Sequence, residues 1–105
     1  MSEFELREDD QPDGPLRLMP TGTLDAQSAP RLKQRLHELR IVGRPVTLDL
    51  SELDAIATEG VEVLVEAHAD ARLKGWKFVI DPALPPAVAS VLRLAHLDGI
   101  VAEDS

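Results

Sequence analysis

The sequence contains no cysteine and no tyrosine, and its only aromatic residues besides histidine are one tryptophan and two phenylalanines among 105 residues. Without cysteine the chain cannot form a disulfide framework, use a thiol nucleophile or bind a cysteine-ligated metal. Basic residues are also few, 11 against 19 acidic ones, and the formal net charge of −8 argues against a non-specific nucleic-acid-binding protein. No apolar run approaches the ~20 residues that span a bilayer, and the N-terminus lacks a signal-peptide pattern. We therefore expect a cytoplasmic protein with no direct membrane insertion.

The composition fits one globular domain over residues 1–105. Hydrophobic residues make up 44% of the chain and charged residues 29%, which are ordinary values for a folded domain with one core. Residues 4–7 and 16–20 alternate apolar and polar side chains, and a Pro- and Asp-rich stretch separates them. This pattern predicts two strands joined as a hairpin, followed by a loop over residues 21–25.

Three helical segments and two further strands follow. Residues 29–42 carry an apolar stripe, with Ser28 expected as N-cap and Gly43 as the end; a second helix is expected from residue 58 to Gly75, and a third from residue 88 to about 97. Residues 46–50 and 76–80 alternate as strands, whereas residues 51–57 are expected to form a turn and a short apolar step. Residues 100 and 101 are expected to form an edge strand or a packed tail.

The element order β-β-α-β-α-β-α predicts a single α/β domain. Its sheet should be mixed, with about four strands and helices packed against it. The apolar positions of the strands and helices define a predicted core: Val46, Leu48, Leu50, Leu64, Ala67, Phe78, Ile80, Val88 and Leu92.

Motifs for catalysis are missing from the chain. The three histidines, His37, His68 and His96, lie in predicted helices without the spacing of a metal site. No nucleophile elbow, phosphate-binding loop or dinucleotide fingerprint occurs. We therefore expect a protein that is not an enzyme and that uses no metal and no cofactor.

The segment Thr58-Glu59-Gly60 opens the second predicted helix. Backbone N–H groups at a helix start are unsatisfied, and the helix dipole favours negative charge there. Such a position can hold a phosphate or a carboxylate in its place. A purely structural interpretation also exists, in which Thr58 is the N-cap and Glu59 a favourable first-turn acid.

Three segments of the chain, within residues 21–32, 46–51 and 81–98, resemble parts of one known family. This family is the STAS domain, the fold of bacterial anti-sigma-factor antagonists that is also found appended to sulphate transporters. Residues 21–25 (Thr-Gly-Thr-Leu-Asp) and 29–32 (Ala-Pro-Arg-Leu) are similar to its Gly-x-Leu-Asp segment and following helix start. Residues 46–51 resemble the strand that enters its switch loop, and residues 81–98 its closing connector and helix. The resemblance implies a protein-binding module in a partner-switching pathway of transcription regulation. The implied partner is an anti-sigma factor or a switch serine kinase.

The switch loop departs from the family's pattern. That loop usually reads Asp-Ser-Ser/Thr-Gly, and the residue before the glycine accepts phosphate, which typically releases the partner. Alignment on Gly60 puts Ala57 in place of the aspartate and Glu59 in place of the phosphoacceptor, with Thr58 between them as a weak candidate acceptor. Glu59 then either imitates a phosphate or marks a relative that has lost the switch.

Charge placement suggests where a partner docks. Glu59, Glu62, Glu66 and Asp70 form an acidic row along one helix, while residues 31–44 hold five of the eleven basic residues and one acid. Such charges either face solvent or steer a partner of complementary charge. The predicted partner-binding residues are Gly22, Asp25, Ala57, Thr58, Glu59, Gly60, Glu62, Glu66 and Asp70.

Two other roles fit the same sequence. A free-standing STAS protein can serve as an accessory subunit of a membrane transport assembly, where it binds an ATP-binding cassette ATPase. It can also act as a scaffold in a larger sensory complex. The oligomeric state is left open.

Overall fold

A computed structural model of the chain describes residues 4–95. Its elements are β1 (Glu5–Asp9), β2 (Leu16–Leu24), α1 (Ala29–Val42), β3 (Val46–Leu48), β4 (Leu53–Ile56), α2 (Thr58–Lys74), β5 (Phe78–Ile80) and α3 (Pro86–Leu94). The predicted α/β class, mixed sheet and element order are confirmed, with β4 as an additional strand. Within residues 4–95, no helix has both the length and the apolar character needed to cross a bilayer.

The long strand β2 organises the mixed sheet of five strands. β1 pairs with it antiparallel as a hairpin, and β3 pairs with its first part in parallel, so that the order across the sheet is β1-β2-β3-β5. β4 lies off this path and pairs in parallel with the last part of β2. The first part of β2 therefore pairs with β3, and its last part pairs with β4, the strand that directly precedes α2.

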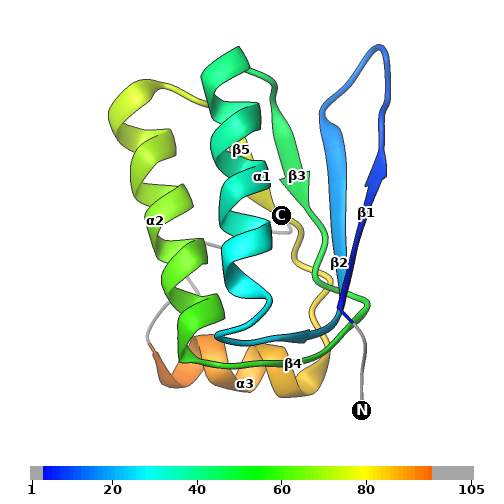
Figure 1. Ribbon diagram of the computed structural model, residues 1–105, viewed down its shortest axis with the longest axis vertical. Helices are drawn as coiled ribbons and strands as arrows, with labels where there is room; N and C mark the ends of the chain where they lie inside the picture. The colour runs from blue at the N-terminus through cyan, green and yellow to red at the C-terminus, as the bar shows by residue number, and fades with distance from the viewer. Residues whose placement is uncertain (1–3, 96–105) are drawn as a thin grey trace.

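The helices enclose the core from one face and one end. α1 and α2 lie side by side on the same face of the sheet, and α3 lies across the end next to β4 (Figure 1). The inward positions of β2 alternate strictly with half-exposed ones, which is the pattern of a strand with one buried face. All nine residues predicted for the core are buried, among them Leu48, Leu64 and Ile80 with no exposed surface.

Two local predictions were wrong. Residues 21–24 continue β2 rather than forming a loop, and residues 53–56 form β4 rather than part of a turn. β4 buries only its first and last residues, so it lacks the alternation that reveals a strand from sequence. Residues 22–24 pair with β4, so these two segments depend on each other through a contact that is distant in sequence.

The helix ends were predicted better than the helix starts. α1 and α2 end at Gly43 and Gly75, whose positive φ angles of 74° and 68° suit glycine. Ser28 occupies the N-cap position of α1, but its side chain makes no cap hydrogen bond. Thr58 is the first residue of α2, whose N-cap position belongs to Ala57, so the prediction of a threonine cap was wrong. The residues expected after position 95, His96 and the possible edge strand at 100 and 101, lie outside the described residues.

Candidate protein-binding site at the start of α2

The end of β2 and the start of α2 lie next to each other. β4 pairs with β2 so that Gly22 faces Leu53 and Leu24 faces Ile56. The backbone N–H of Ala57 then donates to the carbonyl of Leu24 at 2.8 Å, which joins the loop before α2 to the end of β2. Residues 22–25 and 57–60, which the sequence nominated from separate segments, therefore belong to one corner of the molecule.

Gly60 is fixed at this corner by close packing. A Cβ atom on Gly60 would lie 2.7 Å from Cγ and 2.8 Å from Cδ2 of Leu24, and 2.9 Å from Cγ1 of Ile56. Real Cβ atoms do not approach carbon this closely, so only glycine allows α2 to start against β2 and β4. The glycine of the switch-loop pattern thus has a packing role that is independent of any phosphate.

Asp25 shapes the turn from β2 into α1. Its Oδ1 accepts hydrogen bonds from the backbone N–H groups of Gln27 at 3.0 Å and Ser28 at 3.1 Å. The hydroxyl of Ser28 donates to the carbonyl of Thr23 at 2.7 Å and accepts from the backbone N–H of Asp25 at 2.9 Å. The hydrogen bond from the Ser28 backbone is the main reason why the pKa of Asp25 lies below its usual value. Asp25 therefore has a structural role as well as the predicted position at the partner-binding corner.

The first turn of α2 presents its polar side chains outward. Ala57 has an extended backbone, and its carbonyl accepts the first helical hydrogen bond, from Val61 N–H at 3.1 Å. Thr58, Glu59 and Glu62 are exposed. Glu59 and Glu62 form no ion pair with any residue among those the structure describes. These two carboxylates are the charges of the acidic row that remain available to an outside partner.

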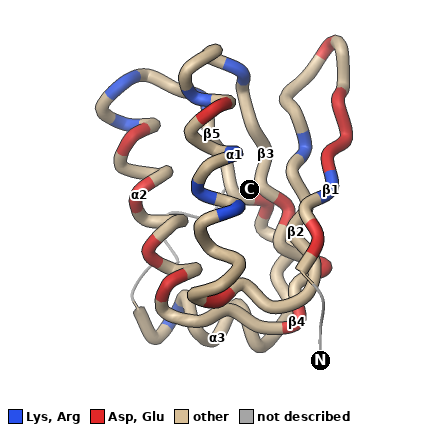
Figure 2. Tube along the Cα trace, in the orientation of Figure 1, with Lys and Arg blue, Asp and Glu red and all other residues tan. Residues whose placement is uncertain are grey.

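The other half of the acidic row is paired with α1. Nζ of Lys33 lies 3.2 Å from a carboxylate oxygen of Glu66, and Nε of Arg40 lies 3.5 Å from one of Asp70. Both pairs link the adjacent helices, where acidic positions of α2 and basic positions of α1 face each other (Figure 2). The row predicted from sequence as one docking surface is therefore divided between an open end and a paired end.

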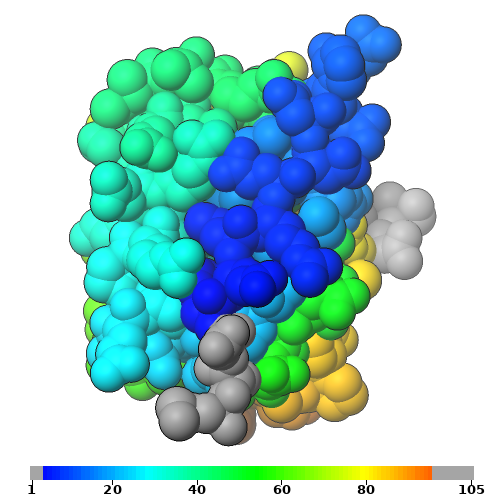
Figure 3. All heavy atoms as spheres, turned by 45° about the vertical axis from the view of Figure 1, so that its right-hand side comes forward, coloured from blue at the N-terminus to red at the C-terminus, as the bar shows by residue number. Residues whose placement is uncertain are grey.

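The remaining basic residues of 31–44 bind β1 and the hairpin. Arg35 makes a two-pronged contact with Glu8, at 2.6 Å from Nε and 2.8 Å from Nη2. Arg44 reaches Asp10 at 2.5 Å and the carbonyls of Gln11 and Gly14, and Arg31 lies over the ring of Phe4. β1 lies directly along α1 in the space-filling view (Figure 3). The basic character of this helix is thus used inside the molecule, between an acidic strand and an acidic helix.

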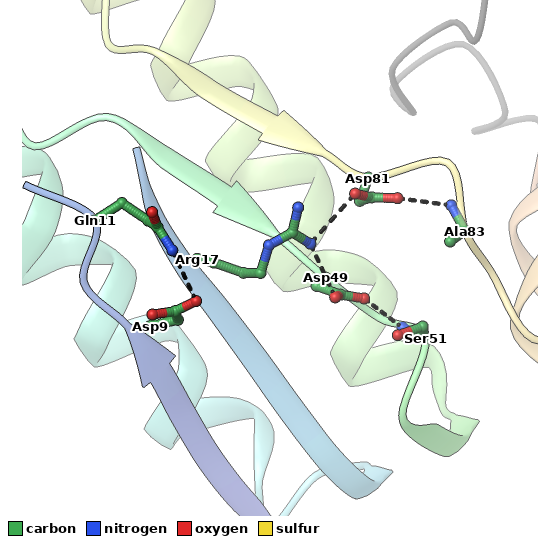
Figure 4. Close-up of polar contacts among 7 residues, drawn as sticks. All are labelled: Asp9, Gln11, Arg17, Asp49, Ser51, Asp81 and Ala83. Atoms are coloured by element: carbon green, nitrogen blue, oxygen red, sulfur yellow. Dashed lines mark hydrogen bonds and ion pairs between the residues drawn. The ribbon is translucent and has the colours of Figure 1, made fainter. Parts of the chain in front are cut away.

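A second polar cluster joins three strands beyond the candidate site. The guanidinium of Arg17 on β2 lies 2.9 Å from Asp49 after β3 and 3.3 Å from Asp81 after β5 (Figure 4). Each carboxylate also turns its own chain, since Asp49 accepts from Ser51 N–H and Asp81 from Ala83 N–H, both at 2.9 Å. Partial burial opposes ionisation of Asp49, but the hydrogen bonds from Ser51 and the contact with Arg17 hold its pKa below its usual value. Sequence reasoning did not find this cluster. Asp81 directly follows the expected strand over residues 76–80, but Asp49 lies inside the expected strand over residues 46–50, which in the structure ends at Leu48.

Metal binding has no support in the described part of the chain. Among residues 4–95, no three His, Asp or Glu side chains are arranged to hold an ion. What the corner can do chemically is present two carboxylates and a hydroxyl, from Thr58, on a rigid support.

Comparison with known proteins assigns this arrangement to a family. The sequence model of the family described as "Mlab, STAS domain" matches residues 8–102. The chain belongs to the STAS domain family. The resemblance drawn from residues 21–32, 46–51 and 81–98 is thereby confirmed.

Solved structures share the STAS fold over nearly the whole chain. An anti-sigma factor antagonist from Mycobacterium paratuberculosis is 22% identical in sequence, with a TM-score of 0.78. The match covers 94% of this chain and 83% of that chain. The anti-sigma factor antagonist SpoIIAA in its unphosphorylated form has the same TM-score at 11% identity. That match covers 96% of this chain and 89% of SpoIIAA. A serine-to-glutamate variant of RsbS from Moorella thermoacetica is 25% identical, with a TM-score of 0.67. That match covers 93% of this chain and 85% of the RsbS chain. The structural neighbours of this STAS domain thus include anti-sigma factor antagonists.

Proposed function

We propose that this STAS domain is a protein-binding module that acts as an anti-sigma-factor antagonist in a partner-switching pathway and is not phosphorylated at position 59. The observation that carries the proposal is the exposed carboxylate of Glu59 in the first turn of α2, beside the end of β2; this carboxylate forms no ion pair within residues 4–95. A carboxylate there carries one negative charge, whereas a phosphoserine carries about −1.5 to −2. The binding state of the module is then fixed or set by its abundance rather than by a kinase.

The binding surface in this proposal is the corner formed by residues 22–25 and 57–60, extended by Glu62. Gly22, Ala57 and Gly60 shape it, Asp25 holds its turn, and Thr58, Glu59 and Glu62 supply its polar contacts. Glu66 and Asp70 lie at the margin of this surface and contribute less to it, because each carboxylate already forms an ion pair with a cation of α1. An anti-sigma factor or switch kinase with a basic docking face would associate by charge steering.

A charge-reversal experiment tests this proposal on the intact chain. Candidate anti-sigma factors and switch kinases of the source organism are titrated against the protein, and association is followed by stopped flow. Glu59→Lys and Glu62→Lys should each slow association several-fold and flatten its dependence on salt, since exposed charges are screened beyond ~8 Å at physiological ionic strength. Asp13→Lys, at the hairpin tip, is the matched control and should leave the rate unchanged. An equal response of all three variants would contradict the proposed surface.

A second function is favoured by the same missing hydroxyl. An accessory subunit of a transport assembly binds its ATP-binding cassette ATPase constitutively and needs no phosphoacceptor before Gly60. Titration with an ATPase of that class in parallel distinguishes the two roles. Binding to the ATPase alone, lost in Glu59→Lys, would replace the sigma-regulatory role while keeping the surface.

A further inference from the structure

Most cations of this acidic protein have a partner within the described residues. Six of its 11 Lys and Arg residues form ion pairs, and Arg31 contacts the carbonyl and ring of Phe4. Within residues 4–95, four cations have no such partner: Arg72, Lys74, Lys77 and Arg93. Three of these four lie within six residues of one another, around the turn from α2 to β5, which makes this end locally positive.

The same end exposes large aliphatic side chains. Leu73 is 81% exposed, and at the neighbouring end of α1 Ile41 is 66% and Val42 75% exposed. The ends of α1 and α2 lie together, opposite the end that carries α3 and the start of α2 (Figures 1 and 2). Between them runs an open groove of about 330 Å³, lined by Arg40, Gly43, Pro45, Lys74, Gly75, Trp76 and Lys77.

Helix electrostatics explain only part of this composition. Arg72 and Lys74 lie in the last turn of α2, where cations offset the negative end of the helix dipole. That effect gives no reason for Lys77, which lies beyond the helix, or for exposing Leu73 between two cations. Lys74 and Lys77 in the groove, with Arg72 and the exposed aliphatic side chains on the adjoining helix ends, together match a partner that is both acidic and apolar.

We propose that the groove between the ends of α1 and α2 is a second docking site, which binds an acidic segment of a protein partner that carries large aliphatic side chains. Carboxylates of the segment meet Arg72, Lys74 and Lys77, and its aliphatic side chains cover Leu73, Ile41 and Val42. α2 separates this groove from the corner at Glu59 by its 17 residues, or roughly 25 Å. The site therefore allows a second partner to bind at the same time as the first.

A protein segment fits this end better than an anionic membrane does. The hairpin tip carries Asp13, which lines the adjoining depression together with Arg44 and Lys77. A flat anionic surface would face this carboxylate and the −8 net charge of the chain along with the cations. A segment that lies in the groove meets the cations at short range, where the distant acids are screened by salt.

The test is a titration of the ¹⁵N-labelled full-length chain with a synthetic amphipathic peptide of ~15 residues, with glutamates on its flanks and leucines on one face. Its matched control has glutamine at every glutamate. Amide shifts should move at residues 40–44 and 72–77 and stay constant at residues 57–62. Arg72→Glu with Lys74→Glu should weaken binding about tenfold, the factor that corresponds to the loss of about 1.4 kcal/mol, and Leu73→Ser should weaken it as well.

The chain offers matched controls for both kinds of change. Arg93 is the fourth cation without an ion pair among residues 4–95, and Leu94 is 80% exposed; both lie on α3 at the opposite end. Arg93→Glu and Leu94→Ser should leave affinity for the peptide unchanged. If Arg72→Glu with Lys74→Glu unfolds the end of α2, the neutral variant Arg72→Gln with Lys74→Gln replaces that variant, after circular dichroism has shown that its helices are intact. Equal binding of the glutamine peptide, shifts at residues 57–62, or no binding at about 1 mM peptide would overturn the proposal. Binding to phosphatidylcholine–phosphatidylglycerol vesicles without binding to the peptide would also overturn it.

Discussion

Gly60 and Leu24 are packed so closely that a Cβ atom on the glycine would lie 2.7 Å from Cγ of the leucine. Leu24 ends β2 and has no exposed surface, and Gly60 lies in the first turn of α2. The contact sets how near the helix start can come to the sheet. It thereby positions Thr58 and Glu59 relative to the turn that Asp25 holds.

Gly60→Ala should therefore destabilise the protein. Alanine is favoured over glycine inside a helix by about 1 kcal/mol, but overpacking of a closed site costs about 1–3 kcal/mol. We expect the clash to exceed the gain, and urea unfolding followed by circular dichroism measures the difference. Gly14→Ala is the control, because a Cβ there would be 3.7 Å from its nearest neighbour, an ordinary contact. A Gly60→Ala variant as stable as the parent would contradict the close packing.

Leu48 should be among the most sensitive positions of the core. It has no exposed surface on β3, between β2 and β5, and truncation of such a leucine costs about 2–5 kcal/mol. Leu73→Ala removes the same atoms from a side chain that is 81% exposed and should change stability by no more than about 0.5 kcal/mol. Thermal melting of both variants checks the contrast. A melting temperature for Leu48→Ala within a degree or two of the parent would show that β3 is wrongly assigned.

The core could be predicted from sequence because apolar period and burial coincide in β2, β3, β5 and the three helices. β4 could not, since its two central residues are exposed and its pairing with β2 is a long-range contact. The corner at Glu59 was nominated through a family pattern, whereas its reason, the approach of Gly60 to Leu24, needed coordinates. The sequence does not tell which charged side chains face each other. The basic helix and the acidic row therefore looked like surfaces for a partner, although many of their charges pair within the molecule. Lys33 with Glu66 and Arg35 with Glu8 settle that point only in three dimensions.

The pair between Lys33 and Glu66 should couple the two helices weakly. Both side chains are more than half exposed, at 63% and 57%, so the interaction is screened by water and is worth about 0.2–1 kcal/mol. In a double-mutant cycle, Glu66→Lys and Lys33→Glu should each lower stability slightly, and the double exchange should recover most of the loss. Glu62→Lys, which breaks no ion pair within residues 4–95, is the control. Strict additivity of the two single changes would mean that the pair contributes nothing.

Asp49 should contribute to the loss of stability in acid. Its pKa is lower in the folded protein than in the unfolded chain, so its contribution is fully present above the unfolded value of about 3.9 and disappears as the pH falls through the lower folded value. Asp49→Asn should therefore unfold more easily near pH 6, and the difference from the parent should shrink below about pH 4. Denaturant unfolding at several pH values measures this, with Asp13→Asn as an exposed control. A difference that stays constant down to pH 2 would exclude titration of Asp49 as its cause.

Phosphorylation offers the most direct test of the corner at Glu59. A kinase needs a hydroxyl oxygen to form a phosphoester, and Glu59 supplies a carboxylate in the first turn of α2. Incubation with ATP and a switch kinase of the partner-switching type should leave the intact mass of the protein unchanged. Glu59→Ser restores the acceptor, and Ala57→Asp together with Glu59→Ser restores both parts of the family's motif, so the double variant should be phosphorylated faster. A phosphate on Thr58 of the unmutated chain would refute the proposal that switch kinases do not phosphorylate this domain.

Partner affinity gives an independent measure of the same residue. If Glu59 imitates a phosphate, Glu59→Ser should bind an anti-sigma-type partner more tightly than the parent does, because phosphorylation in this family typically releases that partner. If Glu59 marks a lost switch and attracts a basic partner by its charge, the substitution should slow association and weaken binding, and removing a first-turn acid should also lower stability by about 0.3–1 kcal/mol. Glu59→Gln keeps the shape of the side chain and removes its charge, so it separates the two outcomes without adding a hydroxyl. Calorimetric titration of the parent and both variants against one partner decides between an imitated phosphate and a lost switch.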